Sequence, residues 1–125
     1  MAWKYFTREE FACKHCQRNL MDDDFIDKLD KLRGLFGFPL PVTSGYRCPE
    51  HNIAVSTTGP NGPHTTGRAV DFDVRGLRAF MLMSVANTSA DFTGFGFKQH
   101  GASRFVHLDD LKLPAYPRPN LWSYP

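Results

Sequence analysis

One stretch of this 125-residue sequence predicts a strand and contains two candidate metal ligands, His64 and Asp71: His64-Thr-Thr-Gly-Arg-Ala-Val-Asp-Phe-Asp-Val74. From Ala69 to Val74, apolar and acidic residues alternate, which is typical of a strand with its carboxylates on one face. Residues 56–63 are rich in Gly, Pro, Ser and Thr and predict a loop that ends at His64. If that loop folds back over the sheet, His64 and Asp71 can converge on one point.

A later strand candidate contains a second histidine that could join His64 and Asp71 in a metal site. Arg104-Phe-Val-His-Leu-Asp109 follows the strand candidate Gly94-Phe-Gly-Phe97, with a turn between them. His107 and Asp109 are two residues apart and therefore share a strand face. Two imidazoles and one carboxylate are a standard catalytic zinc set that leaves a coordination position for water. Spacing alone is weak support, because a single histidine is more often an ordinary side chain than a ligand.

The remaining pattern predicts helices and one further strand. Thr7-Arg-Glu-Glu10 is a capping box that opens a short helix. Three aspartates at 22–24 suit the positive end of a second helix, and Gly37 is placed to end it. Its apolar residues recur at helical spacing: Phe25, Leu29, Leu32 and Phe36. We expect a strand over residues 40–44, a helix from Pro49 to Val55, and another helix over residues 77–85.

Composition indicates one domain, residues 1–125, with an irregular Pro-rich tail at 114–125. The net charge of +2 comes without a Lys/Arg run, which argues against a nucleic-acid partner. The longest apolar run, residues 79–83, is far too short to cross a bilayer, so we expect no membrane insertion. The first ten residues show no apolar segment of the kind that a signal peptide contains. We expect a monomer.

Three cysteines leave alternatives open. Their odd count fits a disulfide framework poorly. Cys13-Lys-His-Cys16 stands without a second pair at zinc-ribbon spacing, so it is half of a small metal site with Cys48, a redox pair, or a set of ordinary buried thiols. Ordinary thiols are the favoured interpretation, because free cysteine is among the most buried residue types.

Three sequence blocks together resemble a known family. They are Ser44-Gly-Tyr-Arg47 with Pro49-Glu-His-Asn52, then His64 to Asp71, then Phe105-Val-His-Leu-Asp109. In this order they are similar to the zinc D-Ala-D-Ala carboxypeptidase family of peptidoglycan peptidases. That family also contains L-Ala-D-Glu endopeptidases, phage endolysins and murein endopeptidases, and it shares its fold with the Hedgehog signalling domain. The resemblance spans roughly residues 5 to 110 and the joint pattern is specific.

The resemblance implies a fold, a metal and a substrate. The expected fold is α+β, with a small, mainly antiparallel sheet and helices packed on one side. The implied Zn²⁺ ligands are His64, Asp71 and His107, and Arg47 matches the arginine that faces the substrate's carboxylate or polarised carbonyl. The implied function is zinc-dependent hydrolysis of peptide bonds in peptidoglycan stem peptides, as an endopeptidase or D,D-carboxypeptidase. Such an enzyme acts outside the cytoplasm at the cell wall, in the periplasm or delivered by a phage or phage-like particle.

The sequence departs from the family at one position. Several relatives carry Glu or Asp three residues before the last zinc histidine, where this chain has Arg104. Asp109 is our candidate for the missing general base, although a carboxylate that only orients His107 would give the same pattern. Asp73, His100 or the substrate itself are weaker alternatives.

Two rival functions follow from these features. The missing acid favours a module of the same fold that keeps the metal and binds the wall without hydrolysing it. The Cys13-x-x-Cys16 pair favours a redox or metal protein that uses its thiols.

Tyr46 and Trp122 are aromatic residues that could contact the substrate, although burial is the default expectation for both.

Overall fold

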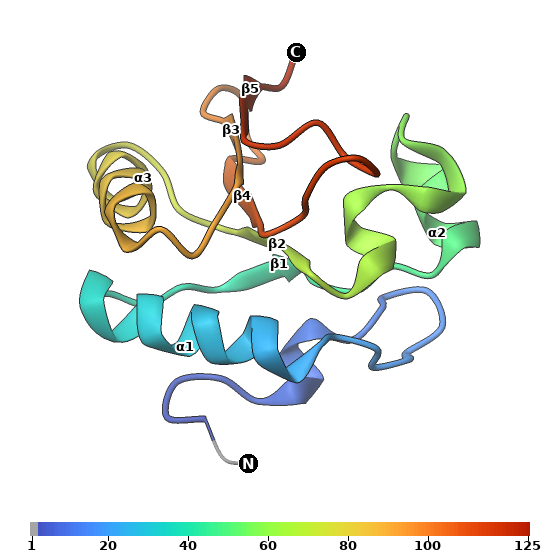
Figure 1. Ribbon diagram of the computed structural model, residues 1–125, viewed down its shortest axis with the longest axis horizontal. Helices are drawn as coiled ribbons and strands as arrows, with labels where there is room; N and C mark the ends of the chain where they lie inside the picture. The colour runs from blue at the N-terminus through green and yellow to red at the C-terminus, as the bar shows by residue number, and fades with distance from the viewer. Residues whose placement is uncertain (1–2) are drawn as a thin grey trace.

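The central sheet takes its strands from segments in which large apolar residues alternate with small or polar ones. In the computed structural model, which describes residues 3–125, five strands lie in the order β1-β2-β4-β3-β5 (Figure 1). Their bounds are Val42–Ser44 (β1), Ala69–Phe72 (β2), Gly94–Lys98 (β3), Phe105–Asp109 (β4) and Asn120–Ser123 (β5). Strands β1 to β4 pair antiparallel, and β5 joins β3 in parallel. The expected α+β fold with a small, mainly antiparallel sheet is confirmed.

The register of β2 against β4 gives the two sheet faces opposite character. Val70 pairs with Leu108 on an apolar face, and the next pair, Asp71 with His107, lies on the opposite face. All four side chains are buried, so both faces of these central strands are covered. A slip of one residue would exchange the faces, and the register therefore sets which chemistry lies on which side.

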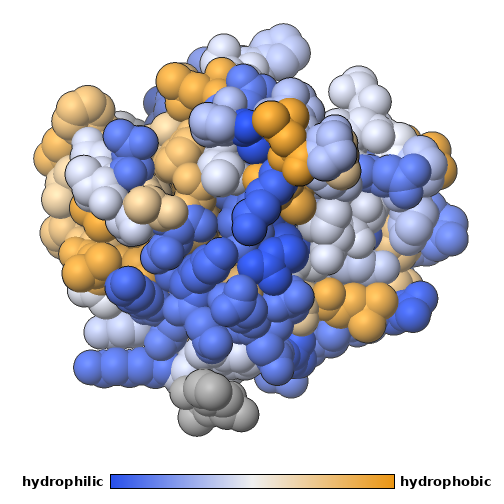
Figure 2. Space-filling model, in the orientation of Figure 1, coloured by the Kyte–Doolittle hydropathy of each residue, from blue (hydrophilic) through white to orange (hydrophobic). Residues whose placement is uncertain are grey.

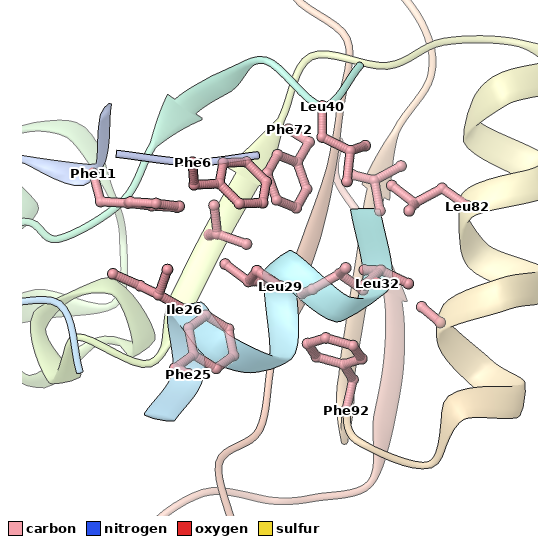
Figure 3. Packing of buried hydrophobic residues seen from close by; sticks show 14 of the residues in the cluster. Phe6, Phe11, Phe25, Ile26, Leu29, Leu32, Leu40, Phe72, Leu82 and Phe92 are labelled. Atoms are coloured by element: carbon pink, nitrogen blue, oxygen red, sulfur yellow. The ribbon is translucent and has the colours of Figure 1, made fainter. Parts of the chain in front are cut away.

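Two long helices cover the apolar face. Helix α1 (Asp23–Phe36) begins at Asp22, whose carboxylate accepts a hydrogen bond from the backbone N–H of Asp24, and ends at Gly37 with φ of 84°. Its buried stripe contacts the sheet and helix α3 (Leu77–Ser89), and Figure 3 shows Leu29 and Leu32 of α1 beside Phe72 and Leu82. The expected caps of α1 are confirmed. The surface of α1 is mainly hydrophilic, with Leu35 exposed near its end, whereas apolar side chains gather along the edge that α3 forms (Figure 2).

Short helical turns build the rest of the framework. These are η1 (Arg8–Phe11) behind the capping box of Thr7, helix α2 (Pro49–Val55), η2 (Gly59–Asn61) and η3 (Pro63–Thr66). Helix α2 packs against η2 and η3. The predicted loop over residues 56–63 contains η2, and its last residue, Pro63, opens η3. Within residues 3–125, no helix has the length and apolarity that a bilayer crossing requires.

The tail is more regular than the sequence predicts. Residues 114–119 are irregular as expected, but Asn120–Ser123 forms β5 beside β3. Gly96 of β3 permits this packing, because a Cβ atom there would lie 2.5 Å from Nε1 of Trp122. The flanking prolines and the distant parallel partner hide this strand from a local pattern, and the expectation of a wholly irregular tail is wrong.

Replacing Gly96 with alanine tests this close approach. The added methyl group would meet the Trp122 indole, so we expect a loss of about 1–3 kcal/mol in the free energy of unfolding and an altered Trp122 fluorescence. Gly34→Ala in α1 is the matched control, because its Cβ would lie 3.5 Å from Tyr5 and alanine favours a helix. Urea unfolding measures both variants. Equal stabilities would contradict the packing of β5 on Gly96.

Candidate metal centre and cleft

His64 is placed by the turn that precedes β2. Pro63 opens η3 and Gly67 ends it with φ of 78°, a conformation that favours glycine. A Cβ atom on Gly67 would also collide with the carbonyl oxygen of Leu20. Nδ1 of His64 donates a hydrogen bond to the carbonyl oxygen of Gly45 at 2.8 Å. Because a carbonyl can only accept, the proton stays on Nδ1 and the lone pair of Nε2 is available to a metal.

Asp71 brings the two histidines together. Its Oδ1 lies 3.3 Å from Nε2 of His64 and 3.0 Å from Nδ1 of His107. All three side chains are buried, and their potential ligand atoms lie within 4.8 Å of one another. Two imidazole nitrogens and one carboxylate oxygen at this separation fit a zinc ion with an open coordination position. The structure therefore gathers the three residues that the sequence singles out as metal ligands.

The electrostatics of this cluster favour a cation. Burial would raise the pKa of Asp71, but the two histidines hold it well below the ordinary aspartate value. Burial would lower the pKa of His107, yet hydrogen bonds to Asp109 and Asp71 raise it. A metal must displace the proton from Nδ1 of His107 before it binds, so we expect metal affinity to fall as the pH is lowered.

Asp109 lies behind His107 and not at the open side of the cluster. Its Oδ2 accepts from Nε2 of His107 at 2.8 Å, and Arg118 holds both oxygens, with Nε at 2.9 Å from Oδ1 and Nη2 at 2.8 Å from Oδ2. Gly94 of β3 makes room, because a Cβ atom there would collide with the carboxylate. Burial opposes ionisation of Asp109, but Arg118 and His107 lower its pKa to about 2.

Of the two roles predicted for Asp109, this geometry favours the orientation of His107 over that of general base. Both carboxylate oxygens are already bound, and the side chain is fully buried on the far side of the imidazole from Asp71. Asp109 instead holds the proton of His107 on Nε2, which leaves Nδ1 to face the metal position. Arg118 had no signal in the sequence, because a lone arginine between prolines has no periodic context.

Arg47 is held at the edge of the cluster. Its Nη2 lies 3.5 Å from Oδ2 of Asp71, while Nε donates to Ser44 at 3.1 Å and Nη1 to Asn52 at 3.0 Å. Asn52 is fully buried and its amide donates in turn to Thr58. Ser44 and Asn52 therefore hold the guanidinium plane of Arg47 in place. Sequence spacing alone did not indicate this role.

A cleft of about 910 Å³ opens over these residues. Residues 55–58 and 61–63 line it together with residues of the C-terminal tail. The ring of Trp122 lies 5.2 Å from that of His107, centroid to centroid. Burial raises the pKa of Tyr124 to about 12, so its phenol stays protonated and can donate a hydrogen bond. Trp122 thus lines the cleft, whereas Tyr46 is buried in the core.

Comparison with protein-family models places the same residues in a described family. The model of peptidase M15 matches residues 4–109, a range that contains His64, Asp71, His107 and Arg47. The chain belongs to the peptidase M15 family.

Curated relatives of this M15 chain carry one name. The chain is 28% identical to the peptidoglycan L,D-endopeptidase MepK of Escherichia coli (strain K12) over 95 residues. The aligned region covers 71% of this chain and 50% of MepK. MepK of Shigella flexneri gives the same identity and coverage. The chain thus spans about half the length of the curated relatives it matches. No solved structure gives a significant match.

The weaker candidates for a base lie outside the cleft of this M15 domain. Asp73 is exposed beyond the end of β2, 3.7 Å from Arg75. His100 is exposed and its Nε2 lies 3.3 Å from the backbone carbonyl of Tyr124. Among the residues that the structure describes, Asp71 is the one carboxylate that lines the cleft.

Replacing Asp109 with asparagine tests its orienting role. Asparagine keeps one accepting oxygen, and its NH2 group can only donate, so it cannot accept from both His107 and Arg118 as the carboxylate does. The imidazole then loses its support, and zinc affinity should fall about 10- to 100-fold. Asp73→Asn makes the same chemical change at an exposed site and should leave affinity unchanged. Zinc competition titration, with the His107 resonances followed by NMR, measures both. Unchanged affinity in Asp109→Asn would show that His107 is held by other contacts.

Proposed function

We propose that this chain hydrolyses peptide bonds in bacterial cell-wall peptidoglycan and uses a zinc ion held by His64, Asp71 and His107. The observation that carries the proposal is the convergence of three buried ligand atoms beneath an open cleft, beside a fixed arginine. Membership of the M15 peptidase family supports hydrolysis of peptide bonds. The name of the MepK relatives supports peptidoglycan as the substrate.

The ligand set supports a catalytic more than a structural metal. Zinc bound by three protein ligands supplies Lewis acidity toward a carbonyl oxygen and a nucleophile from water at neutral pH. The chain's own contribution is orientation. Gly45 and Asp109 hold the outer nitrogens of His64 and His107, so the inner nitrogens keep their direction when substrate enters.

Arg47 supplies fixed positive charge at the reacting end of the cleft. Ser44 and Asn52 occupy Nε and Nη1, which leaves Nη2 directed toward Asp71 and the cleft. A fixed guanidinium can bind a substrate carboxylate or stabilise the oxyanion that develops on the scissile carbonyl. Lys98 lines the same cleft and adds positive charge, which suits the carboxylates of peptidoglycan stem peptides.

The substrate also sets the place of action. Peptidoglycan lies outside the cytoplasm, so we propose that the chain works at the cell wall, in the periplasm or after delivery by a phage or phage-like particle. We propose that it works as a monomer.

The rival function is a wall-binding module that keeps the metal and does not hydrolyse. Two observations favour this module. Arg104 occupies the position where several relatives carry an acid, and Asp71 is the one Asp or Glu among the described residues that line the cleft. We therefore assign no carboxylate of the chain as general base in the hydrolytic proposal.

Digestion of purified peptidoglycan separates the two functions. We expect new amino termini and smaller muropeptides, detected by mass spectrometry, with loss of activity after chelation and recovery with added zinc. His64→Ala should be inactive because one of the three ligands is missing. Binding to the wall without released peptides, in zinc-loaded protein, would favour the non-hydrolytic module. The muropeptide masses also tell endopeptidase from carboxypeptidase cleavage.

Substitution of Arg47 by lysine tests the role of the fixed guanidinium group. A point charge on a flexible stem cannot keep the contacts to Ser44 and Asn52, so we expect kcat to fall about 100- to 1000-fold with zinc content unchanged. Arg104→Lys is the matched control. Within residues 3–125 the Arg104 side chain donates to the Gly101 carbonyl alone, and Arg104 does not line the cleft. Near-normal turnover of Arg47→Lys would make Arg47 a structural partner of Asp71.

A further inference from the structure

The three cysteines, which the proposed function does not use, converge in the structure. The Sγ atoms of Cys13, Cys16 and Cys48 all lie within 4.8 Å of one another, and no two are joined in a disulfide. Cys13 and Cys48 are buried and Cys16 is half-buried. A tetrahedral metal with metal–sulfur bonds of about 2.3 Å holds its sulfurs about 3.8 Å apart, so the cluster has the size of a metal site.

The backbone around Cys13 is folded tightly. The N–H of Cys13 donates to the carbonyl of Arg18, the N–H of Gln17 donates to the carbonyl of Cys13, and Gln17 has φ of 63°. This turn carries both cysteines of the Cys-x-x-Cys pair. The backbone N–H of Cys48 donates to Sγ of Cys13 at 3.3 Å, a contact that favours a thiolate.

A fourth donor lies within the same turn. Nδ1 of His15 lies 3.3 Å from Sγ of Cys48, and the ring of His15 stacks on that of His51 at 5.8 Å between centroids. His15, Cys48 and Glu50 form a second group whose ligand atoms lie within 4.8 Å of one another, whereas His15 does not join the group of three sulfurs within that distance. The exposed ring of His15 would therefore have to move toward Cys13 and Cys16 when a metal binds. Three cysteines and one histidine are a standard structural zinc set, so His15 is favoured over Glu50.

We propose that Cys13, Cys16, Cys48 and His15 bind a second, structural zinc ion, separate from the cluster of His64, Asp71 and His107. The thiols lose their protons on binding, and four protein ligands close the coordination sphere. This set replaces ordinary thiols as the favoured interpretation of the cysteines, because an isolated thiol does not require three convergent sulfurs with a histidine beside them.

The proposed site would link two segments that support the residues around His64 and Arg47. In Figure 1 the loop between η1 and α1 lies beside α2, and the site joins that loop to Cys48, the residue before α2. Cys48 follows Arg47 directly. The N–H of Tyr46 donates to the carbonyl of Phe11 at 2.8 Å, so the same N-terminal segment also supports Gly45 and, through its carbonyl, His64.

Cobalt substitution tests the proposal, since thiolate ligands give an intense charge-transfer absorption that imidazole and carboxylate ligands lack. We expect wild type to bind about two metals per chain. His64→Ala should keep the charge-transfer band with about one metal, because only the histidine–aspartate cluster is damaged. Cys16→Ser should lose the band and keep about one metal. The two variants thus report on the two sites separately, and failure of either leaves the other interpretable.

Two results would overturn the proposal. One is a cobalt-loaded His64→Ala protein without the charge-transfer band. The other is a single reactive thiol when unfolded, unreduced protein is titrated, which would show a disulfide in place of a metal site. Release of about one zinc per wild-type chain by a mercurial reagent supports the proposal without any variant, so poor folding of Cys16→Ser does not remove the test.

Discussion

The pairing of Asp71 with His107 across β2 and β4 is the constraint on which the rest of the site depends. An antiparallel register places these two side chains opposite each other, on the sheet face that α1 and α3 do not cover. The same register buries the alternate residues, Val70 and Leu108, beneath the helices. The same register therefore determines both the packing of the core and the pairing of Asp71 with His107, and a strand shifted by one residue would lose both.

Buried charge at this face is stabilised by a chain of contacts. Arg118 holds Asp109, Asp109 holds His107, and His107 meets Asp71, which His64 and Arg47 also approach. An unpaired buried carboxylate would be costly, and each one here faces at least one cation or imidazole. The glycines of β3 matter for the same reason, since Gly94 leaves space for the Asp109 carboxylate and Gly96 for the Trp122 indole.

The sequence predicted what depends on local pattern or on a specific motif. Helix α1 follows from aspartates at one end and Gly37 at the other, and the motif blocks indicated the three clustered residues and Arg47. It did not predict β5 or Arg118, because neither has a local signal in a Pro-rich tail. Strand periodicity placed Asp109 on the face of His107, but only the rotamer of the imidazole decides which nitrogen it binds. The ligand roles themselves stay predictions.

Diffraction at the zinc absorption edge, on crystals of the zinc-loaded protein, tests the central claim most directly. The account predicts an anomalous peak bounded by Nε2 of His64, Nδ1 of His107 and the carboxylate of Asp71, with Asp109 still bound to Nε2 of His107. Absence of a peak between these three side chains would contradict it. So would a metal bound through Nε2 of His107, because Asp109 would then be a ligand and not the support of one.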